Sequence, residues 1–117
     1  MASGAQRYYL GIDDLPRARG SNEQLAFQGD SPEALARELQ AALRTPVLFE
    51  RWRALQDDPD AIDPSLGATD PSATVSAKQS DLHVDVVATT RLPHSILKHR
   101  LSLLVGPHWT LRDVKSA

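Results

Sequence analysis

The chain has 117 residues, 41% of them hydrophobic and 24% charged, and its formal net charge is −2. This balance is typical of one folded globular domain and excludes an intrinsically disordered chain. Cysteine is absent, which excludes disulfides, thiol catalysis and thiolate-bound metals, and no apolar run approaches the roughly 18 residues of a membrane span.

The first residues, 1–7, lack the apolar core of a secretory signal. With no cysteine and no membrane span, the sequence predicts a cytoplasmic protein that does not insert into a membrane. Ten arginines stand against three lysines, a bias that GC-rich coding produces and that favours a bacterial source.

Charge is unevenly distributed along the chain. Residues 1–54 carry seven basic and seven acidic side chains, residues 55–89 one basic and seven acidic, and residues 90–117 five basic and one acidic. Subtracting these counts gives net charges of 0, −6 and +4 for the three segments. Such separation either steers a charged partner or pairs the two segments with each other, and internal pairing is the simpler explanation.

Two strands are predicted near the N-terminus. Alternating apolar residues over 7–12 indicate a half-buried strand. Residues 13–22 have the composition of a loop. Residues 24–28 form a second, short strand, which we expect to pair antiparallel with the first.

Two helices are predicted next. Either Asp30 or Ser31 caps the first helix, whose apolar residues recur at helical spacing as far as Leu43. Thr45 and Pro46 repeat the start signal, so a bend and a second helix follow.

Residues 57–73 contain three Asp-Pro steps, which predict a long exposed loop because proline and the residue before it disfavour helix. The aspartates of this loop suggest calcium, which binds carboxylate oxygens. Their spacing lacks the central glycine and the closing glutamate of an EF-hand. We therefore expect no metal ion and no other cofactor.

The strongest strand signal covers residues 82–89, where apolar and polar side chains alternate. Residues 74–78 predict a strand that forms a hairpin with it and places 82–89 in the interior of the sheet. The apolar side of residues 96–105 predicts a helix that ends at Gly106.

One alternative remains open at the C-terminus. Leu101, Leu103 and Val105 also alternate, so residues 100–105 would serve as a strand paired with the last strand, 108–114. The clear stop after residue 105 makes us prefer the helix. The element order is then ββααββαβ in one domain, residues 1–117. This order predicts an α+β two-layer sandwich with helices packed on one face of a mainly antiparallel sheet.

His83 and Asp85 are the first candidate site, because both lie on one face of the strongest strand with Cα atoms about 6.6 Å apart by strand rise. Such a pair serves as a metal ligand with its supporting carboxylate, or as a base with the group that orients it. We favour the simpler interpretation that both side chains lie on the solvated face of a half-buried strand.

Arg100 and Trp109 are a candidate partner surface. Arg100 falls inside the apolar arc of its helix, so its guanidinium must find a carboxylate or extend along its stem to water. Arginine and tryptophan together favour interfaces, and an edge position for Trp109 would recruit a partner by strand addition. The competing account is internal, with Asp81 or Asp85 neutralising the nearby basic side chains.

No nucleophile elbow, phosphate loop or dinucleotide-binding motif occurs, so no enzyme of these motif classes is predicted. The best hypothesis is a non-enzymatic interaction module that binds another protein or itself as a homodimer. The alternative is a small enzyme or ligand-binding domain centred on His83 and Asp85. A third hypothesis is weak nucleic-acid contact through the basic segment 90–100, which the pI of about 6.0 disfavours.

Overall fold

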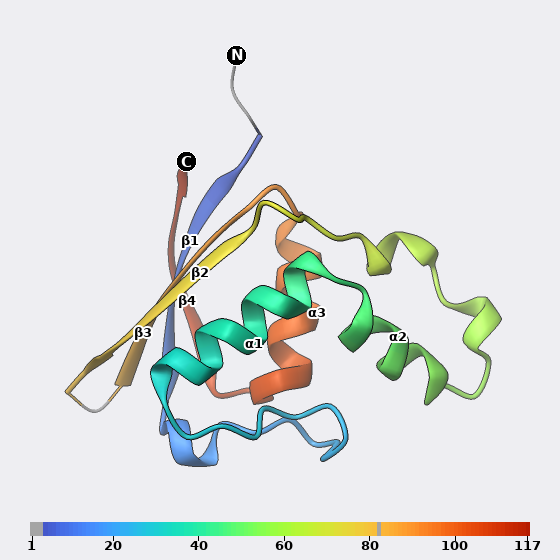
Figure 1. Cartoon of the computed structure of the whole chain (residues 1–117), viewed down its shortest axis with the longest axis horizontal. Coiled ribbons are helices and arrows are strands. Elements are labelled where there is room, and N and C mark those ends of the chain that lie inside the picture. The colour runs from blue at the N-terminus through green and yellow to red at the C-terminus, as the bar shows by residue number, and fades with distance from the viewer. Residues whose placement is uncertain (1–3, 82) are drawn as a thin grey trace.

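The computed structural model describes residues 4–81 and 83–117, and it has the predicted α+β class (Figure 1). Two predictions fall partly outside the described residues. They concern Leu82, the expected first residue of the strongest strand, and residues 1–3, which belong to the segment predicted to lack a secretory signal. The strands are β1 (Gln6–Asp13), β2 (Thr74–Ser80), β3 (His83–Thr90) and β4 (Trp109–Ser116), and the helices are α1 (Pro32–Arg44), α2 (Val47–Ala54) and α3 (His94–Val105). Three short 3₁₀ turns, η1 (Leu15–Arg17), η2 (Pro59–Ala61) and η3 (Pro64–Gly67), lie in the connections.

The four strands form one antiparallel sheet in the order β2-β3-β1-β4. β2 and β3 form the predicted hairpin, so β3 lies in the interior of the sheet. Because helices of the described chain cover only one face of the sheet, every second residue of β3, from Val84 to Thr90, is buried.

Helices α1 and α3 cover one face of the sheet, whereas α2, η2 and η3 extend sideways from these two layers (Figure 1). The molecule is consequently flat, with Cα extents of 42 × 41 × 18 Å. The core lies between the sheet and the two helices. It includes Tyr8, Leu10, Ile12, Val84 and Val86 from the sheet, Leu35, Leu39 and Leu43 from α1, and Leu97 and Leu101 from α3.

The predicted strand over residues 24–28 is wrong, because this segment pairs with no strand. It packs as a loop beside the C-terminal end of α3. The N–H groups of Gly20 and Phe27 both donate to the carbonyl of Leu104, at 3.1 and 2.8 Å. A carbonyl in the last turn of a helix has no partner within the helix, so it accepts these bonds from a neighbouring loop. The ring of Phe27 is fully buried, which accounts for the apolar residues that suggested a strand.

Helix α3 ends as predicted, and the alternative strand over residues 100–105 is wrong. Gly106 follows the last helical residue with φ of 63°, a backbone conformation that glycine adopts without a steric penalty. A Cβ at this position would also lie 2.8 Å from the carbonyl oxygen of Arg19. The stop therefore depends on glycine for both conformation and space.

Among the described residues, no helix has the length and hydrophobicity needed to cross a membrane.

Candidate functional site

The outer face of the sheet is a candidate site because no helix lies on it in the described part of the chain (Figure 1). Alternation along each strand directs polar side chains to this face, opposite the core. The register aligns Gly11 of β1 with Asp85 of β3 on one side and with Thr110 of β4 on the other.

His83, Asp85 and Arg112 form a chain of polar contacts across this face. Nε2 of His83 lies 3.0 Å from Oδ1 of Asp85, and Nη1 of Arg112 lies 3.5 Å from the same oxygen. Arg112 comes from β4, two strands away, and its side chain crosses β1 at Gly11. A Cβ on Gly11 would lie 2.8 Å from Nε of Arg112, so the missing side chain of glycine provides the path.

The structure thus brings the predicted pair of His83 and Asp85 together and adds Arg112. The three side chains are 28%, 44% and 49% exposed, which leaves them well solvated. Exposed ion pairs of this kind contribute about 0–1 kcal/mol to stability. Sequence reasoning missed Arg112 because a β-bulge in β4 determines the direction of its side chain.

Arg100 does not belong to a surface, so its assignment to a partner surface is wrong. It is fully buried. Nη1 donates to the carbonyl of Ala42 near the end of α1, and Nη2 donates to the carbonyls of Leu66 and Ala68 at 2.7 and 2.9 Å. The side chain thereby ties α3 to the C-terminus of α1 and to the segment around η3. Asp81 and Asp85, the expected internal partners of the basic side chains, do not contact it, but Asp85 does pair with the basic side chain of Arg112.

The carbonyl partners of Arg100 are physically reasonable. The C-terminal carbonyls of a helix have no partners within the helix and carry partial negative charge, so they stabilise a cation there. Burial lowers the pKa of the Arg100 guanidinium, but arginine remains protonated in proteins. The expectation that the guanidinium finds a carboxylate or extends to water is therefore wrong, because it is buried against backbone carbonyls.

Because Arg100 is buried, its charge is not available for nucleic-acid contact through the basic segment 90–100. In this segment His99 is half-buried, with its ring centroid 4.5 Å from that of Trp52 in an edge-on contact. Only Arg91, His94 and Lys98 expose their charged or titratable side chains. Three scattered side chains form a weaker phosphate-binding surface than the five that the sequence offered.

Asp70 is an organising residue that the sequence analysis did not identify. It is 6% exposed and accepts hydrogen bonds from the side chain and N–H of Ser72, the hydroxyl of Thr90 and the N–H of Arg91, at 2.6 to 3.0 Å. Burial alone would raise its pKa, but these bonds outweigh burial and lower the pKa to about 2. Asp70 therefore joins the long connection to the end of β3, and its role is structural.

Trp109 begins β4, where it is half-buried on the core side of the sheet opposite Ile12. β4 is an edge strand, because among the described residues it pairs only with β1. The N–H of Asp13 donates to the carbonyl of His108, and the N–H of Ala117 donates to the carbonyl of Ala5. The odd-numbered residues of β1 therefore direct their backbone groups at β4. Their partners in the strand are Thr110, Asp113 and Lys115.

The other residues of β4 direct their backbone N–H and C=O groups at the free edge. These residues are Trp109, Leu111, Val114 and Ser116. Arg112 is not one of them, because it is the extra residue of a bulge. Val114 shows this directly, because its N–H donates to Oδ1 of its neighbour Asp113 at 2.8 Å and not to β1. The register shift between Tyr9 and Leu10 makes Arg112 the extra residue of a bulge. Arg112 and Asp113 consequently both lie on the outer face.

The opposite edge of the sheet is more protected. The N–H of Val75 on β2 donates to Oε1 of Gln40 at 3.0 Å, so a side chain of α1 covers part of this edge. Lys78 lies in the middle of β2, and an edge lysine opposes strand addition, as Lys115 also does on β4. The free backbone groups of β4 are therefore the more accessible of the two edges.

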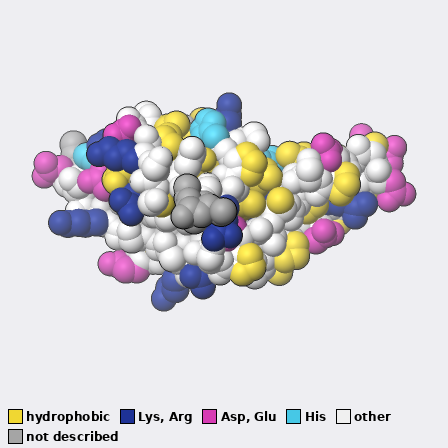
Figure 2. Space-filling view, turned by 90° about the horizontal axis from the view of Figure 1, so that it is seen from above, with side chains coloured by type: hydrophobic (Ala, Val, Ile, Leu, Met, Phe, Trp, Pro, Cys, Tyr) yellow, Lys and Arg dark blue, Asp and Glu magenta, His cyan; other side chains and the backbone are white. Residues whose placement is uncertain are grey.

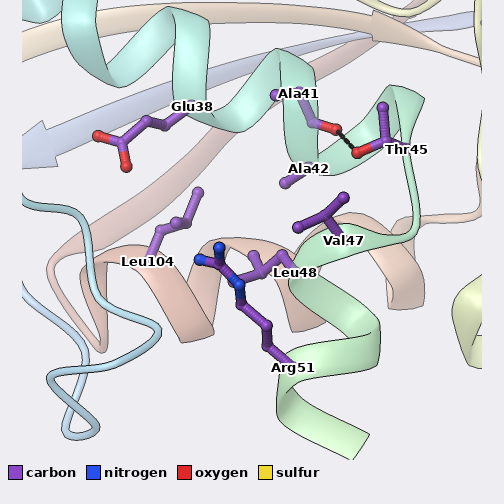
Figure 3. Close-up of a pocket in the computed structure, with 8 residues that line it drawn as sticks. All are labelled: Glu38, Ala41, Ala42, Thr45, Val47, Leu48, Arg51 and Leu104. Atoms are coloured by element: carbon purple, nitrogen blue, oxygen red, sulfur yellow. Dashed lines mark hydrogen bonds between the residues drawn. The ribbon is translucent and has the colours of Figure 1, made fainter.

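A small pocket lies where α1, α2 and α3 meet (Figure 3). Its apolar lining includes Ala42, Leu48 and Leu104, and the guanidinium of Arg51 points across it from α2. Burial raises the pKa of Glu38 at its margin. The volume of about 110 Å³ is well below the roughly 300 Å³ at which sites for drug-sized ligands begin.

Acidic side chains gather at the end of the molecule farthest from the sheet (Figure 2). They belong to the segment between α2 and η3 and include the exposed Asp57, Asp58, Asp60 and Asp63. Asp60 and Glu50 lie 3.5 and 3.9 Å from the guanidinium of Arg53. No group of three or more potential metal ligands of the His, Cys, Asp or Glu type occurs among residues 4–81 and 83–117.

Comparisons with protein-family models, with curated proteins and with solved structures give no match to this chain.

Proposed function

We propose that this protein is an interaction module that binds a partner chain along the free edge of β4. The observation that carries the proposal is the set of four residues of β4 whose backbone groups point away from β1. An extended segment of a partner binds such an edge by continuing the ladder of backbone hydrogen bonds.

The side chains of β4 support this mode of binding. Val114 is a large hydrophobic residue that is 39% exposed, and it lies beside the free edge. Leu111 and Trp109 are only half-buried, so strand addition would remove further apolar surface from water. Backbone bonds would supply affinity, while these side chains would select the partner.

Replacing Val114 tests the proposal without disturbing the sheet. Val114→Pro removes the N–H that points to the free edge, and that N–H makes no bond to β1, so proline is tolerated at this edge position. Val114→Thr retains the N–H and the branched shape and is the matched control. We expect the two variants to unfold at similar temperatures.

The readout is recovery of partner chains that copurify with the tagged protein from its own cells. The proposal expects Val114→Thr to retain them and Val114→Pro to lose most of them. Equal recovery with both variants, or recovery from neither wild type nor variant, would contradict it.

The contact between His83 and Asp85 supports a second candidate function, a small-ligand or catalytic site on the outer face. A histidine with one nitrogen held by a carboxylate is the arrangement used for metal binding and for proton transfer. Titration with Zn²⁺, followed through the ring resonances of His83, distinguishes the two functions. Saturable micromolar binding that is lost in Asp85→Asn would favour the second.

A further inference from the structure

The pattern of free backbone groups on β4 has a symmetry that points to a particular partner. The edge-facing residues are Trp109, Leu111, Val114 and Ser116. They lie symmetrically about the peptide bond between Arg112 and Asp113, because the bulge inserts one residue in the middle of the strand. In a regular strand, edge-facing residues recur every second position throughout.

We infer that the partner is a second copy of this chain, paired antiparallel with β4 across a twofold axis that passes midway between the Arg112–Asp113 peptide bonds of the two strands. In this register the numbers of two facing residues add up to 225. Trp109 therefore faces Ser116 of the second copy and Leu111 faces Val114, so all four edge-facing residues meet edge-facing residues. Leu111 then exchanges both backbone hydrogen bonds with Val114 of the second copy. The inference rests on the proposed function, since it names the chain that the β4 edge binds.

The side chains agree with this register on the core side of the sheet. Trp109, Leu111 and Val114 face the same side, because they pair with the core residues Ile12, Leu10 and Tyr8 of β1. Leu111 would therefore lie beside Val114 of the second copy, and the pair would cover the exposed part of Val114. Cross-strand apolar pairs of this kind contribute roughly 0.2–1 kcal/mol each.

The outer face supplies complementary charge. Arg112 would face Asp113 of the second copy, and the twofold axis repeats this pair. In the single chain both residues already have exposed ion pairs: Nη1 of Arg112 lies 3.5 Å from Oδ1 of Asp85, and Nζ of Lys115 lies 3.9 Å from Oδ2 of Asp113. To reach the second copy, the guanidinium of Arg112 would leave Asp85 and turn from Gly11 toward the free edge. In the single chain the carboxylate of Asp113 accepts a hydrogen bond from the N–H of Val114. In the dimer this N–H would donate to a carbonyl of the second copy, and the carboxylate would be free to pair with Arg112 of that copy.

Other registers fit less well. Pairing Leu111 with itself would place the edge-facing Trp109 opposite Asp113, whose backbone groups point to β1 and whose side chain lies on the other face. Pairing Val114 with itself would leave Trp109 without a partner within the strand. Of the registers compared, the one in which facing residue numbers add up to 225 pairs the backbone groups of all four edge-facing residues.

Charge reversal tests the inference through the dimerisation constant, measured by sedimentation equilibrium. Arg112→Asp and Asp113→Arg each replace both unlike pairs by like pairs, and we expect each to weaken dimerisation by about tenfold or more. The double variant Arg112→Asp/Asp113→Arg restores unlike pairs in the same register and is expected to recover most of the affinity. A wild-type chain that stays monomeric at millimolar concentration, or a double variant no better than the single ones, would overturn the inference.

Cysteine cross-linking tests the register itself, because the natural chain has no cysteine. Thr110 faces Lys115 of the second copy, whereas within one strand the two residues lie roughly 16 Å apart, too far for a disulfide. Thr110→Cys/Lys115→Cys is expected to give a covalent dimer on mild oxidation, and each single variant is expected to give little. Equal cross-linking of the single variants, or none of the double variant, contradicts the register.

The result also separates this inference from the proposed function. A monomeric wild type whose copurifying partners disappear in Val114→Pro would exclude the second copy as partner and retain the β4 edge as the binding site. Equal partner recovery with Val114→Pro and Val114→Thr would exclude the edge itself.

Discussion

The guanidinium of Arg112 occupies the space that a side chain on Gly11 would take. Nε of Arg112 lies 2.8 Å from the position of a Cβ on Gly11, so arginine and glycine are structurally coupled across two neighbouring strands. The absence of one side chain lets another cross the strand and reach Asp85.

Gly11→Ala should therefore act through Arg112. We expect the substitution to displace the guanidinium and to break its contact with Asp85. The cost should be modest, up to about 1 kcal/mol, because the displaced group is the exposed end of a flexible side chain.

A double-mutant cycle measures this coupling in urea unfolding experiments. Gly11→Ala should be more destabilising in the wild-type chain than in the Arg112→Ala background, where the space is already empty. Equal effects in both backgrounds would mean that the two residues are not coupled.

Arg100→Met should destabilise the fold strongly. The substitution keeps the apolar stem but leaves the buried carbonyl of Ala42 and the partly buried carbonyls of Leu66 and Ala68 without their donor. We expect a loss of about 2–4 kcal/mol in the free energy of unfolding, since each buried carbonyl without a partner costs about 1–3 kcal/mol and some will find water. Arg91→Met, which removes an exposed guanidinium from the same basic segment, is the control and should change stability by less than about 0.5 kcal/mol.

The elements that local patterns define were predictable from the sequence. The alternation over β3 and the capping signals of α1 depend on neighbouring residues, and the structure reproduces both. The segment around Phe27 was misassigned because its apolar residues satisfy the core equally well as an ordered loop against α3.

The candidate site was predictable only in part, because it depends on register and not on composition. His83 and Asp85 lie two residues apart in one strand, and their proximity follows from strand geometry. Arg112 reaches them through a bulge and a glycine on another strand, and neither leaves a signal in the local pattern. The symmetry of the β4 edge likewise requires knowing which residues pair with β1.

Acid should weaken the fold through Asp70. Hydrogen bonds to its buried carboxylate lower the pKa from the usual 3.8 to about 2, so the folded state holds this group ionised where the unfolded chain protonates it. The stabilisation is full above the unfolded pKa and is lost as the pH falls from about 4 toward 2. The difference of nearly two pKa units corresponds to roughly 2 kcal/mol.

Asp70→Asn should remove most of this acid dependence and lower stability at neutral pH. The amide retains the shape of the carboxyl group but accepts hydrogen bonds through only one oxygen. Asp57→Asn, in the exposed part of the same connection, is the matched control and should leave the pH profile unchanged. An unaltered loss of stability between pH 4 and pH 2 in Asp70→Asn would show that other carboxylates carry the effect.

Protonation of His99 should weaken the fold at mildly acidic pH. Its ring lies edge-on to Trp52, and its Nδ1 is buried without a hydrogen-bond partner among the described residues. Burial lowers the pKa of His99, and the positive charge of neighbouring Arg100 lowers it further. Because the folded state then binds the proton less readily than the unfolded chain, stability is full above pH 6.5 and falls as the pH drops from there toward the lowered pKa.

His99→Phe separates the charge from the ring contact, since phenylalanine retains an aromatic ring against Trp52 but cannot be protonated. We expect its free energy of unfolding to change less than that of the wild type between pH 7.5 and pH 5, measured by urea unfolding. His94→Gln, which alters an exposed histidine in the same helix, should follow the wild-type profile. A His99→Phe profile that follows the wild type throughout would mean that folding does not change the pKa of His99.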